Sequence, residues 1–147
     1  MTNLGNAPKG KNTFCKEERL YRKILIDELF KTSEGFIKYP FRVIYKRSSA
    51  PGNFPIRLAV SVSKRKIKNA VDRNRIKRMT KEVYRRNKRE IYKYAGNGIT
   101  MDAMFVYMDK SVYPFSEIEK AVIKINRKLS LVLENEIRTS EISAPIL

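Results

Sequence analysis

The first part of the chain shows one helical pattern followed by two strand patterns. Apolar residues recur near helical spacing through Leu25 and Leu29, which predicts a first helix from about Glu18 to Thr32. Short runs of aromatic and β-branched residues then predict two strands, over residues 36–39 and 41–46. The chain therefore begins its folded part as a helix that leads into a pair of strands.

The middle of the chain predicts a hairpin loop, a third strand and a long helix. Turn-forming residues fill positions 48–53, and apolar residues alternate with small ones from Ile56 to Ser63. Asn69 is a plausible N-cap, with an acidic residue three positions later, for a helix that could run to about Tyr92. The sequence Gly96-Asn97-Gly98 is expected to stop that helix.

The last part predicts a fourth strand and a final helix. The strand covers Met101 to Met108, and Ser116 with Glu119 forms a capping-box pattern at the start of the helix. One apolar stripe runs along the predicted final helix: Ile118, Val122, Ile125, Leu129 and Val132. This stripe is typical of a helix that packs on a sheet.

The resulting element order is αβββαβα. Such a mixed order predicts an α+β fold, a two-layer sandwich in which helices pack on a four-stranded sheet. We expect one folded domain over residues 16–134, with a flexible N-terminal extension at 1–15 and a flexible C-terminal tail at 135–147.

Charge narrows the class of partner. The chain of 147 residues holds 32 Lys and Arg against 15 Asp and Glu, a formal net charge of +17. Such an excess favours a polyanion, with nucleic acid ahead of an anionic membrane surface. No stretch is long and apolar enough to span a bilayer and no secretory signal is evident, so we expect a cytoplasmic protein whose Cys15 has no disulfide role.

The residues that are absent argue against chemistry carried by the chain itself. The sequence has no His and one Cys, which removes imidazole acid/base chemistry, the usual catalytic triads and most zinc sites. A magnesium nuclease needs clustered carboxylates, whereas the acidic residues here are dispersed along helix faces. We therefore expect no catalytic residue and no metal ligand on this chain.

The positive charge is concentrated on the predicted second helix and the residues before it. Fourteen of the 32 basic residues, but three of the 15 acidic ones, lie between Lys64 and Lys93. Cations crowd the start of the helix, where the helix dipole disfavours them unless a phosphate is bound. We expect this segment to bind RNA, and the candidates are Lys64, Arg65, Lys68, Arg73, Asn74, Arg75, Lys77, Arg78, Lys81 and Arg85.

The same segment resembles a known family. The runs Ser61-Val62-Ser63-Lys64-Arg65 and Asn69-Ala70-Val71-Asp72-Arg73-Asn74-Arg75-Ile76-Lys77-Arg78 are similar to the signature of bacterial ribonuclease P proteins. Upstream, Arg19-Leu20, Leu29-Phe30-Lys31 and Val43-Ile44-Tyr45 resemble the first helix and second strand of that family. The resemblance covers about Arg19 to Leu133 and implies the family's αβββαβα fold.

The resemblance implies a function and a second site. Family members are RNA-binding subunits that assist a catalytic RNA in endonucleolytic removal of the 5′ leader from precursor tRNA. Catalysis and magnesium are then expected in the RNA-containing holoenzyme, with no cofactor held by the protein alone and no obligatory protein partner. The family's cleft between first helix and sheet takes the leader, which points to Phe30, Tyr45, Ser61 and Lys64.

Two other functions remain open on the residues alone. A structural ribosomal protein, or another RNA-scaffold protein, would share the charge and the fold but would not need a substrate cleft. A DNA-binding protein would place the basic helix in the major groove, but no second helix closely precedes that helix and no dimerisation stripe is present.

Overall fold

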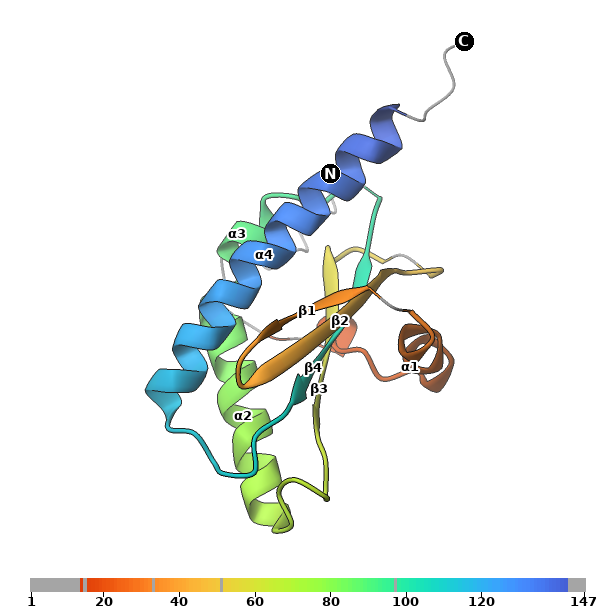
Figure 1. The fold of residues 1–147 in the computed structure, drawn as a ribbon. Coiled ribbons are helices and arrows are strands. Elements are labelled where there is room, and N and C mark those ends of the chain that lie inside the picture. Colours follow the sequence, from red (N-terminus) through yellow and green to blue (C-terminus); the bar gives the residue numbers. More distant parts are fainter. Residues whose placement is uncertain (1–13, 15, 33, 51, 97, 143–147) are drawn as a thin grey trace.

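A four-stranded sheet forms the centre of the protein (Figure 1). The structure is a computed structural model that describes residues 14–142 except 15, 33, 51 and 97. The strands are β1 (Gly35–Lys38), β2 (Phe41–Arg47), β3 (Ile56–Val62) and β4 (Met101–Tyr107), in the order β1-β2-β4-β3. Strands β3 and β4 are parallel and the other neighbours are antiparallel. All four strands were predicted close to these positions.

Helices cover the sheet on both faces (Figure 1). Helices α2 (Ala70–Arg86), α3 (Arg89–Tyr92) and α4 (Phe115–Ile142) pack on one face, and α1 (Lys23–Phe30) lies on the other. The α+β fold with helices packed on a four-stranded sheet is therefore confirmed. The short α1 adds a smaller layer on the second face.

Strand alternation divides the apolar side chains between two cores. Alternate residues of the sheet, such as Val43, Leu58 and Phe105, are buried against α2 and α4 in the larger core. Their neighbours Ile44 and Met104 point to the other face and form a small core with α1. Because side chains alternate with a period of two, the two faces are distinct surfaces set by the parity of each strand position.

The first helix is shorter than predicted. Residues 16–18 form a 3-10 turn, and the backbone N–H of Leu20 donates to the carbonyl of Leu58 on β3 at 2.9 Å. The expected start at Glu18 is wrong, because the chain up to Leu20 pairs with the sheet edge and the helix begins at Lys23. The predicted flexible extension lies outside the described residues except for Phe14.

The long basic helix is interrupted before Tyr92. Helix α2 ends at Arg86, and the carbonyl of Asn87 accepts a hydrogen bond from the Asn126 side chain of α4 at 2.9 Å. This tertiary contact replaces the next helical hydrogen bond of that carbonyl, so the prediction of one continuous helix is wrong. After α3, Gly96 and Gly98 adopt positive φ values of 87° and 75° and the next element is β4, so the predicted end of the helical stretch before the fourth strand is confirmed.

The final helix differs from the prediction at both ends. It begins at Phe115, and the carbonyl of Pro114 accepts hydrogen bonds from the backbone of its first turn. Ser116 therefore lies inside the first turn and is not the N-cap. At the other end the helix continues to Ile142, so residues 135–142 are helical and not part of a flexible tail. Positions 143–147 lie outside the described residues.

A buried ion pair joins the segment before α1 to the junction of α2 and α3. The ammonium group of Lys88 donates to the Glu18 carboxylate at 2.6 Å, and the two side chains are 4% and 0% exposed. The Tyr92 hydroxyl donates to the same carboxylate oxygen. This contact holds the chain leading into α1 against the opposite layer.

We predict that Lys88→Met lowers the free energy of unfolding by about 3–5 kcal/mol, because it leaves a buried carboxylate without its ammonium partner. Urea unfolding measures the change. Lys93→Met, at an exposed position just after α3, is the matched control and is expected to change stability by less than about 0.5 kcal/mol. Equal losses in the two variants would contradict the structural role of the pair.

Candidate nucleic-acid interface

The N-terminal half of α2 presents polar residues to solvent. The Asn69 side chain accepts a hydrogen bond from the backbone N–H of Val71 at 2.8 Å and so begins the helix, as predicted. From this start, Asn74, Arg75 and Arg78 lie exposed, whereas the buried residues of α2 face the sheet. Three of the predicted RNA-binding residues thus share one accessible surface.

Arg73 is bound to the loop that precedes its own helix. Its Nη1 atom donates to the carbonyl of Ile67 at 2.9 Å and to that of Lys68 at 2.9 Å. These bonds fix the polypeptide between β3 and α2. Arg73, which we expected to contact RNA, therefore has a structural task in the free protein that Arg75 does not share among the described contacts.

Glu82 pairs with two of the cations near the end of α2. Its carboxylate accepts hydrogen bonds from Arg85 at 2.6 Å and from Arg86 at 2.8 Å. The Arg85 hydrogen bond is the main cause that lowers the pKa of Glu82 to about 2. Arg85, which we expected to bind RNA, therefore has its charge compensated in the free protein. The uncompensated surface lies nearer the start of the helix.

Lys81 lies in a crowded group of cations. Burial lowers its pKa, and the neighbouring charges of Arg19 and Lys77 lower it further. Both Lys77 and Lys81 are half-buried. Three close positive charges repel one another in the free protein, and a bound phosphate would relieve that repulsion.

A row of side chains crosses the sheet on the α1 face. Arg42 on β2 lies opposite Val106 on β4, and Val106 lies opposite Ser61 on β3. Residues paired in this way point to the same face, and Ile44 and Met104 of the next row on that face lie beneath α1. The row of Arg42, Val106 and Ser61 is therefore the first row of sheet beside α1.

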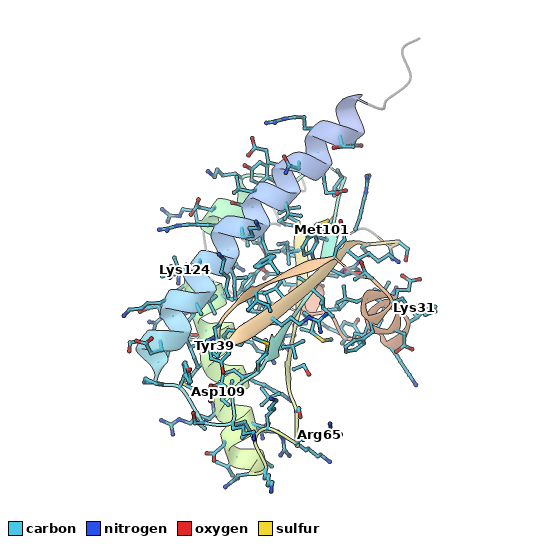
Figure 2. All side chains as sticks on the ribbon, in the orientation of Figure 1. Lys31, Tyr39, Arg65, Met101, Asp109 and Lys124 are labelled. Atoms are coloured by element: carbon cyan, nitrogen blue, oxygen red, sulfur yellow. The ribbon has the colours of Figure 1, made fainter. Side chains whose placement is uncertain are left out.

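The row opens into a groove of about 810 Å³ at the end of the sheet where α2 begins. Figure 2 shows Arg65 at this end of the sheet. We call this hollow the basic groove. It combines four cations with an apolar floor, and its lining residues are Arg42, Ser63, Lys64, Arg65, Lys66, Val106, Tyr107 and Met108.

A second hollow, of about 410 Å³, adjoins the basic groove around the start of α2. Arg65 and Lys66 line both hollows, and Lys68 and Lys110 line the second one. The predicted cations before α2 thus surround one continuous positive surface. Asp72 is the acidic residue in this lining.

Asp109, which follows Met108 of the groove lining, accepts hydrogen bonds from within the protein. Asp109 accepts hydrogen bonds from the Tyr39 hydroxyl at 2.5 Å and from the backbone and hydroxyl of Ser111. Figure 2 shows Tyr39 and Asp109 close together beside this end of the sheet. These bonds, that from Tyr39 first, hold the pKa of Asp109 well below its usual range. Asp109 therefore stabilises the loop between β4 and α4 through these hydrogen bonds.

Phe30 lies on the edge of α1 that faces the basic groove. On the other edge, the Glu28 carboxylate accepts a hydrogen bond from the Ser49 hydroxyl at 3.0 Å, so that edge faces the loop after β2. At about 100° per residue, Phe30 falls roughly opposite Glu28, one turn beyond Ile26, which packs on the small core. Phe30 is 60% exposed and is not a core residue.

Tyr45 does not lie in the cleft beside α1. It packs against the larger core on the opposite face of the sheet, with its ring 6.1 Å from that of Phe36. Burial raises the pKa of its hydroxyl. The prediction is wrong because Ile44, the preceding residue, occupies the α1 face.

Reasoning from the sequence missed Arg42, Lys66 and Lys110. Arg42 has the same strand parity as Ile44, so the alternation along β2 would have placed it on the cleft face. Lys66 is one of the cations before α2. Lys110 follows β4, and no sequence signal connects it with the start of α2.

The described residues contain neither a cluster of metal-binding side chains nor a helix able to span a membrane. Among residues 14–142, apart from those the structure leaves out, no group of three or more His, Cys, Asp and Glu side chains could hold a metal ion. No helix in the described part of the chain has the length and apolar character needed to cross a membrane.

Comparisons with known sequences point to one family. A family model described as Ribonuclease P matches residues 14–130. A ribonuclease P protein component from Petrotoga mobilis is 32% identical over 117 residues, which covers 80% of this chain and 95% of that protein. One from Porphyromonas gingivalis is 41% identical over 73 residues, so the match covers 50% of this chain and about half (53%) of that relative's length.

Solved structures with the same fold carry the same description. The RNase P protein from Thermotoga maritima aligns with a TM-score of 0.58 at 23% identity, over 76% of this chain and 96% of that one. The RNase P protein from Staphylococcus aureus aligns with a TM-score of 0.55 at 20% identity, over 79% of this chain and 97% of that one. At such identities the likeness establishes the fold.

We predict that Arg73→Ala lowers the free energy of unfolding by about 1.5 kcal/mol, because two hydrogen bonds from a charged group to backbone carbonyls are lost. Arg75→Ala removes the same side chain from an exposed position two residues later and is expected to stay within about 0.5 kcal/mol of wild type. Urea unfolding distinguishes the two. If Arg73→Ala were as stable as Arg75→Ala, the bracing role of Arg73 would be refuted.

Proposed function

Because this chain belongs to the ribonuclease P protein family, we propose that it is the RNA-binding subunit of ribonuclease P. In this role it assists a catalytic RNA in the endonucleolytic removal of the 5′ leader from precursor tRNA. The observation that carries the proposal is the continuous positive surface formed by the basic groove and the start of α2.

The two parts of this surface suit two kinds of RNA contact. The exposed side of α2 offers Asn74, Arg75 and Arg78 on a rigid rod, which suits the phosphates and base edges of a structured RNA. The groove beside α1 is lined by four cations and by the apolar side chains of Val106 and Met108, which suits an unpaired strand. We assign the α2 surface to the catalytic RNA and the groove to the leader.

The structure changes which residues carry the leader-binding proposal. In this proposal Ser61 and Lys64 remain leader-binding residues, Phe30 lies on the neighbouring edge of α1, and Arg42 takes the place of Tyr45 on β2. An aromatic ring beside cations is the arrangement that stacks an unpaired base and binds its phosphate. In this proposal magnesium belongs to the RNA-containing complex, and the cations of this chain reduce the repulsion between leader and catalytic RNA and so favour metal and substrate binding.

The exposed arginines of α2 test the assignment of this surface to the catalytic RNA. Arg75→Gln and Arg78→Gln are each expected to reduce the slope of log Kd against log salt for the catalytic RNA by about one, because each loses one phosphate contact. Arg85→Gln is the matched control, since Glu82 already compensates that charge in the free protein. Filter binding over a salt series measures the slopes. A reduction in Arg85→Gln as large as that in Arg75→Gln would contradict the assignment.

Cleavage and binding of precursor tRNA test the assignment of the groove to the leader. With the cognate catalytic RNA at low magnesium, wild-type protein is expected to increase cleavage of precursor tRNA. Arg42→Gln is expected to weaken binding of a precursor with a long leader by about tenfold, but to leave binding of a precursor with a one-nucleotide leader unchanged, because a charge-assisted phosphate contact is lost. Tyr45→Phe, on the other face of the sheet, is the control.

A leader-length series separates this function from that of a structural RNA-scaffold protein. Such a protein would bind RNA with the same salt dependence but would be indifferent to leader length. Absence of any stimulation of cleavage, or an equal effect of Arg42→Gln on long and short leaders, would overturn the leader-binding proposal.

A further inference from the structure

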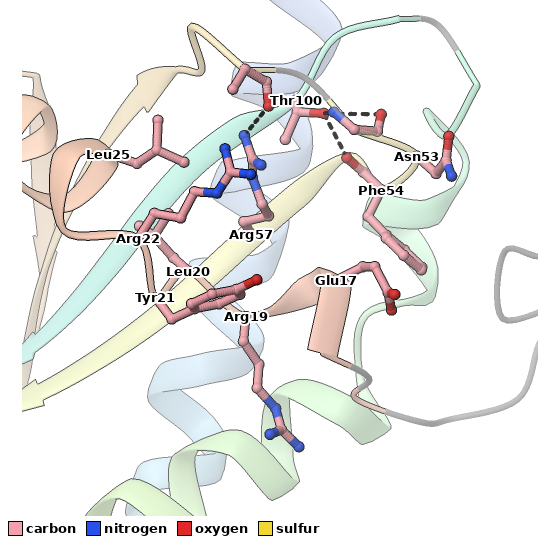
Figure 3. A pocket seen from close by; sticks show the side chains of 12 residues that line it. Glu17, Arg19, Leu20, Tyr21, Arg22, Leu25, Asn53, Phe54, Arg57 and Thr100 are labelled. Carbon is pink, nitrogen blue, oxygen red and sulfur yellow. Dashed lines mark hydrogen bonds between the residues drawn. The ribbon is translucent and has the colours of Figure 1, made fainter.

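A separate hollow lies on the other side of α1 from the basic groove (Figure 3). Its volume is about 330 Å³, and it lies between the segment that leads into α1 and the loop between β2 and β3. The lining includes Leu20 from the segment before α1, Leu25 from α1 itself, and Asn53 and Phe54 from the loop. We call it the α1 pocket. The basic groove shares none of its lining residues.

The floor of the α1 pocket is held by a network around Arg57. Its Nε donates to the Asp102 carboxylate at 3.1 Å, and its guanidinium also donates to the Ser48 hydroxyl and the Ala50 carbonyl. The Arg57 side chain is 14% exposed. Burial raises the pKa of Asp102 although the charge of Arg57 lowers it.

The loop wall is fixed by Thr100. Its hydroxyl donates to the Phe54 carbonyl at 2.9 Å and accepts from the Gly52 N–H at 2.9 Å, as the dashed lines in Figure 3 show. Together with the Arg57 network, these bonds join the loop to β3 and to the start of β4. The pocket is therefore a built cavity with defined walls.

The mouth of the pocket combines an aromatic ring with cations. Tyr21 is 59% exposed, and the ammonium group of Lys16 lies 5.7 Å from its ring centroid. Figure 3 shows Arg22 at the pocket, whereas Arg19 points away from it, and its guanidinium lies 5.6 Å from the Phe14 ring centroid. Among the described residues no carboxylate forms an ion pair with Arg22 or Arg19. Glu17 is the carboxylate in the lining.

We propose that the α1 pocket binds an unpaired nucleotide of an RNA strand, with its base on the Tyr21 ring and its phosphate on Arg22. The volume is at the lower end of the range of about 300–1,000 Å³ for pockets that enclose small ligands. Stacking on an exposed ring beside a guanidinium group is tolerant of sequence, and the exposed Asn53 offers hydrogen bonds to a base edge.

The assignment goes beyond the proposed function, because the leader and the catalytic RNA are already placed on the groove and on α2. It gives the protein a second single-strand contact, separated from the first by the body of α1. A free mononucleotide has the same chemistry as a nucleotide in a strand, so the experiment must separate these two sources.

Amide NMR of the full chain tests the pocket without any catalytic RNA. Pentaadenylate is expected to shift the resonances of Tyr21, Arg22, Asn53 and Thr100, and to do so at a concentration at least tenfold lower than adenosine monophosphate requires. Equal affinity for the two ligands would overturn the assignment to an RNA strand. Shifts confined to Arg42, Ser61 and their neighbours would overturn the pocket itself.

Variants separate the α1 pocket from the basic groove. Tyr21→Leu is expected to weaken the affinity measured from the pocket shifts at least about fivefold, because base stacking is lost. Tyr21→Phe is expected to retain that affinity. Arg22→Gln is expected to weaken the binding of pentaadenylate more than the binding of adenosine, which has no phosphate. The groove variant Arg42→Gln should leave the pocket shifts unchanged. Unaltered binding in Tyr21→Leu, with a folded spectrum, would refute the proposal while leaving the leader assignment intact.

Discussion

The central position of β4 is the constraint on which the rest of the structure depends. It lies between β2 and β3 and is covered on both faces, so its side chains have to satisfy two different surroundings. Phe105 and its alternates fill the large core, whereas Met104 supports α1. Asp102 has the same parity as Met104 and is buried beside Arg57, which supplies its counter-charge. Burying this carboxylate without that partner would be costly.

This parity creates two polar margins on either side of α1. On one margin, the Arg57 and Asp102 row is neutralised within the fold and forms the floor of the α1 pocket. On the other, the row of Arg42 and Ser61 opens into the basic groove. The buried contact between Glu18 and Lys88 anchors the chain just before α1. The α1 pocket and the basic groove are therefore separated by α1, whose preceding segment is held in place by the contact between Glu18 and Lys88.

Local pattern was enough for the features that depend on local chemistry. Runs of aromatic and β-branched residues located β1 and β2, alternation of apolar and small residues located β3, and Asn69 began α2 as its N-cap. The failures at the start of α1 and at the end of α2 involve partners distant in sequence. The residues before Lys23 pair with β3, and the carbonyl of Asn87 is taken by Asn126 on another helix. Nothing in the sequence around these positions announces those partners.

The candidate site shows the same division. The segment from Lys64 to Arg78 was located by its charge, and its exposed members lie where a helical pattern places them. Charge alone did not tell that Arg73 is bound to backbone carbonyls or that Glu82 holds Arg85, because this depends on side-chain geometry. Tyr45 was placed by resemblance to a family pattern, although the alternation through Ile44 already predicted the opposite face.

The distribution of acidic residues explains how a compact fold tolerates a net charge of +17. Glu18, Asp102 and Glu82 each neutralise a cation that has a place in the fold. By contrast, among the described residues no carboxylate forms an ion pair with the four cations that line the basic groove: Arg42, Lys64, Arg65 and Lys66.

The positive charge therefore divides into a compensated part that stabilises the fold and an uncompensated part that faces solvent. Repulsion within the second part opposes folding of the free protein, and a bound polyanion removes it. Because a ligand that binds only the folded state stabilises that state, a polyanion bound at these side chains would favour folding. The groove is thus a place where uncompensated positive charge lowers the stability of the free protein.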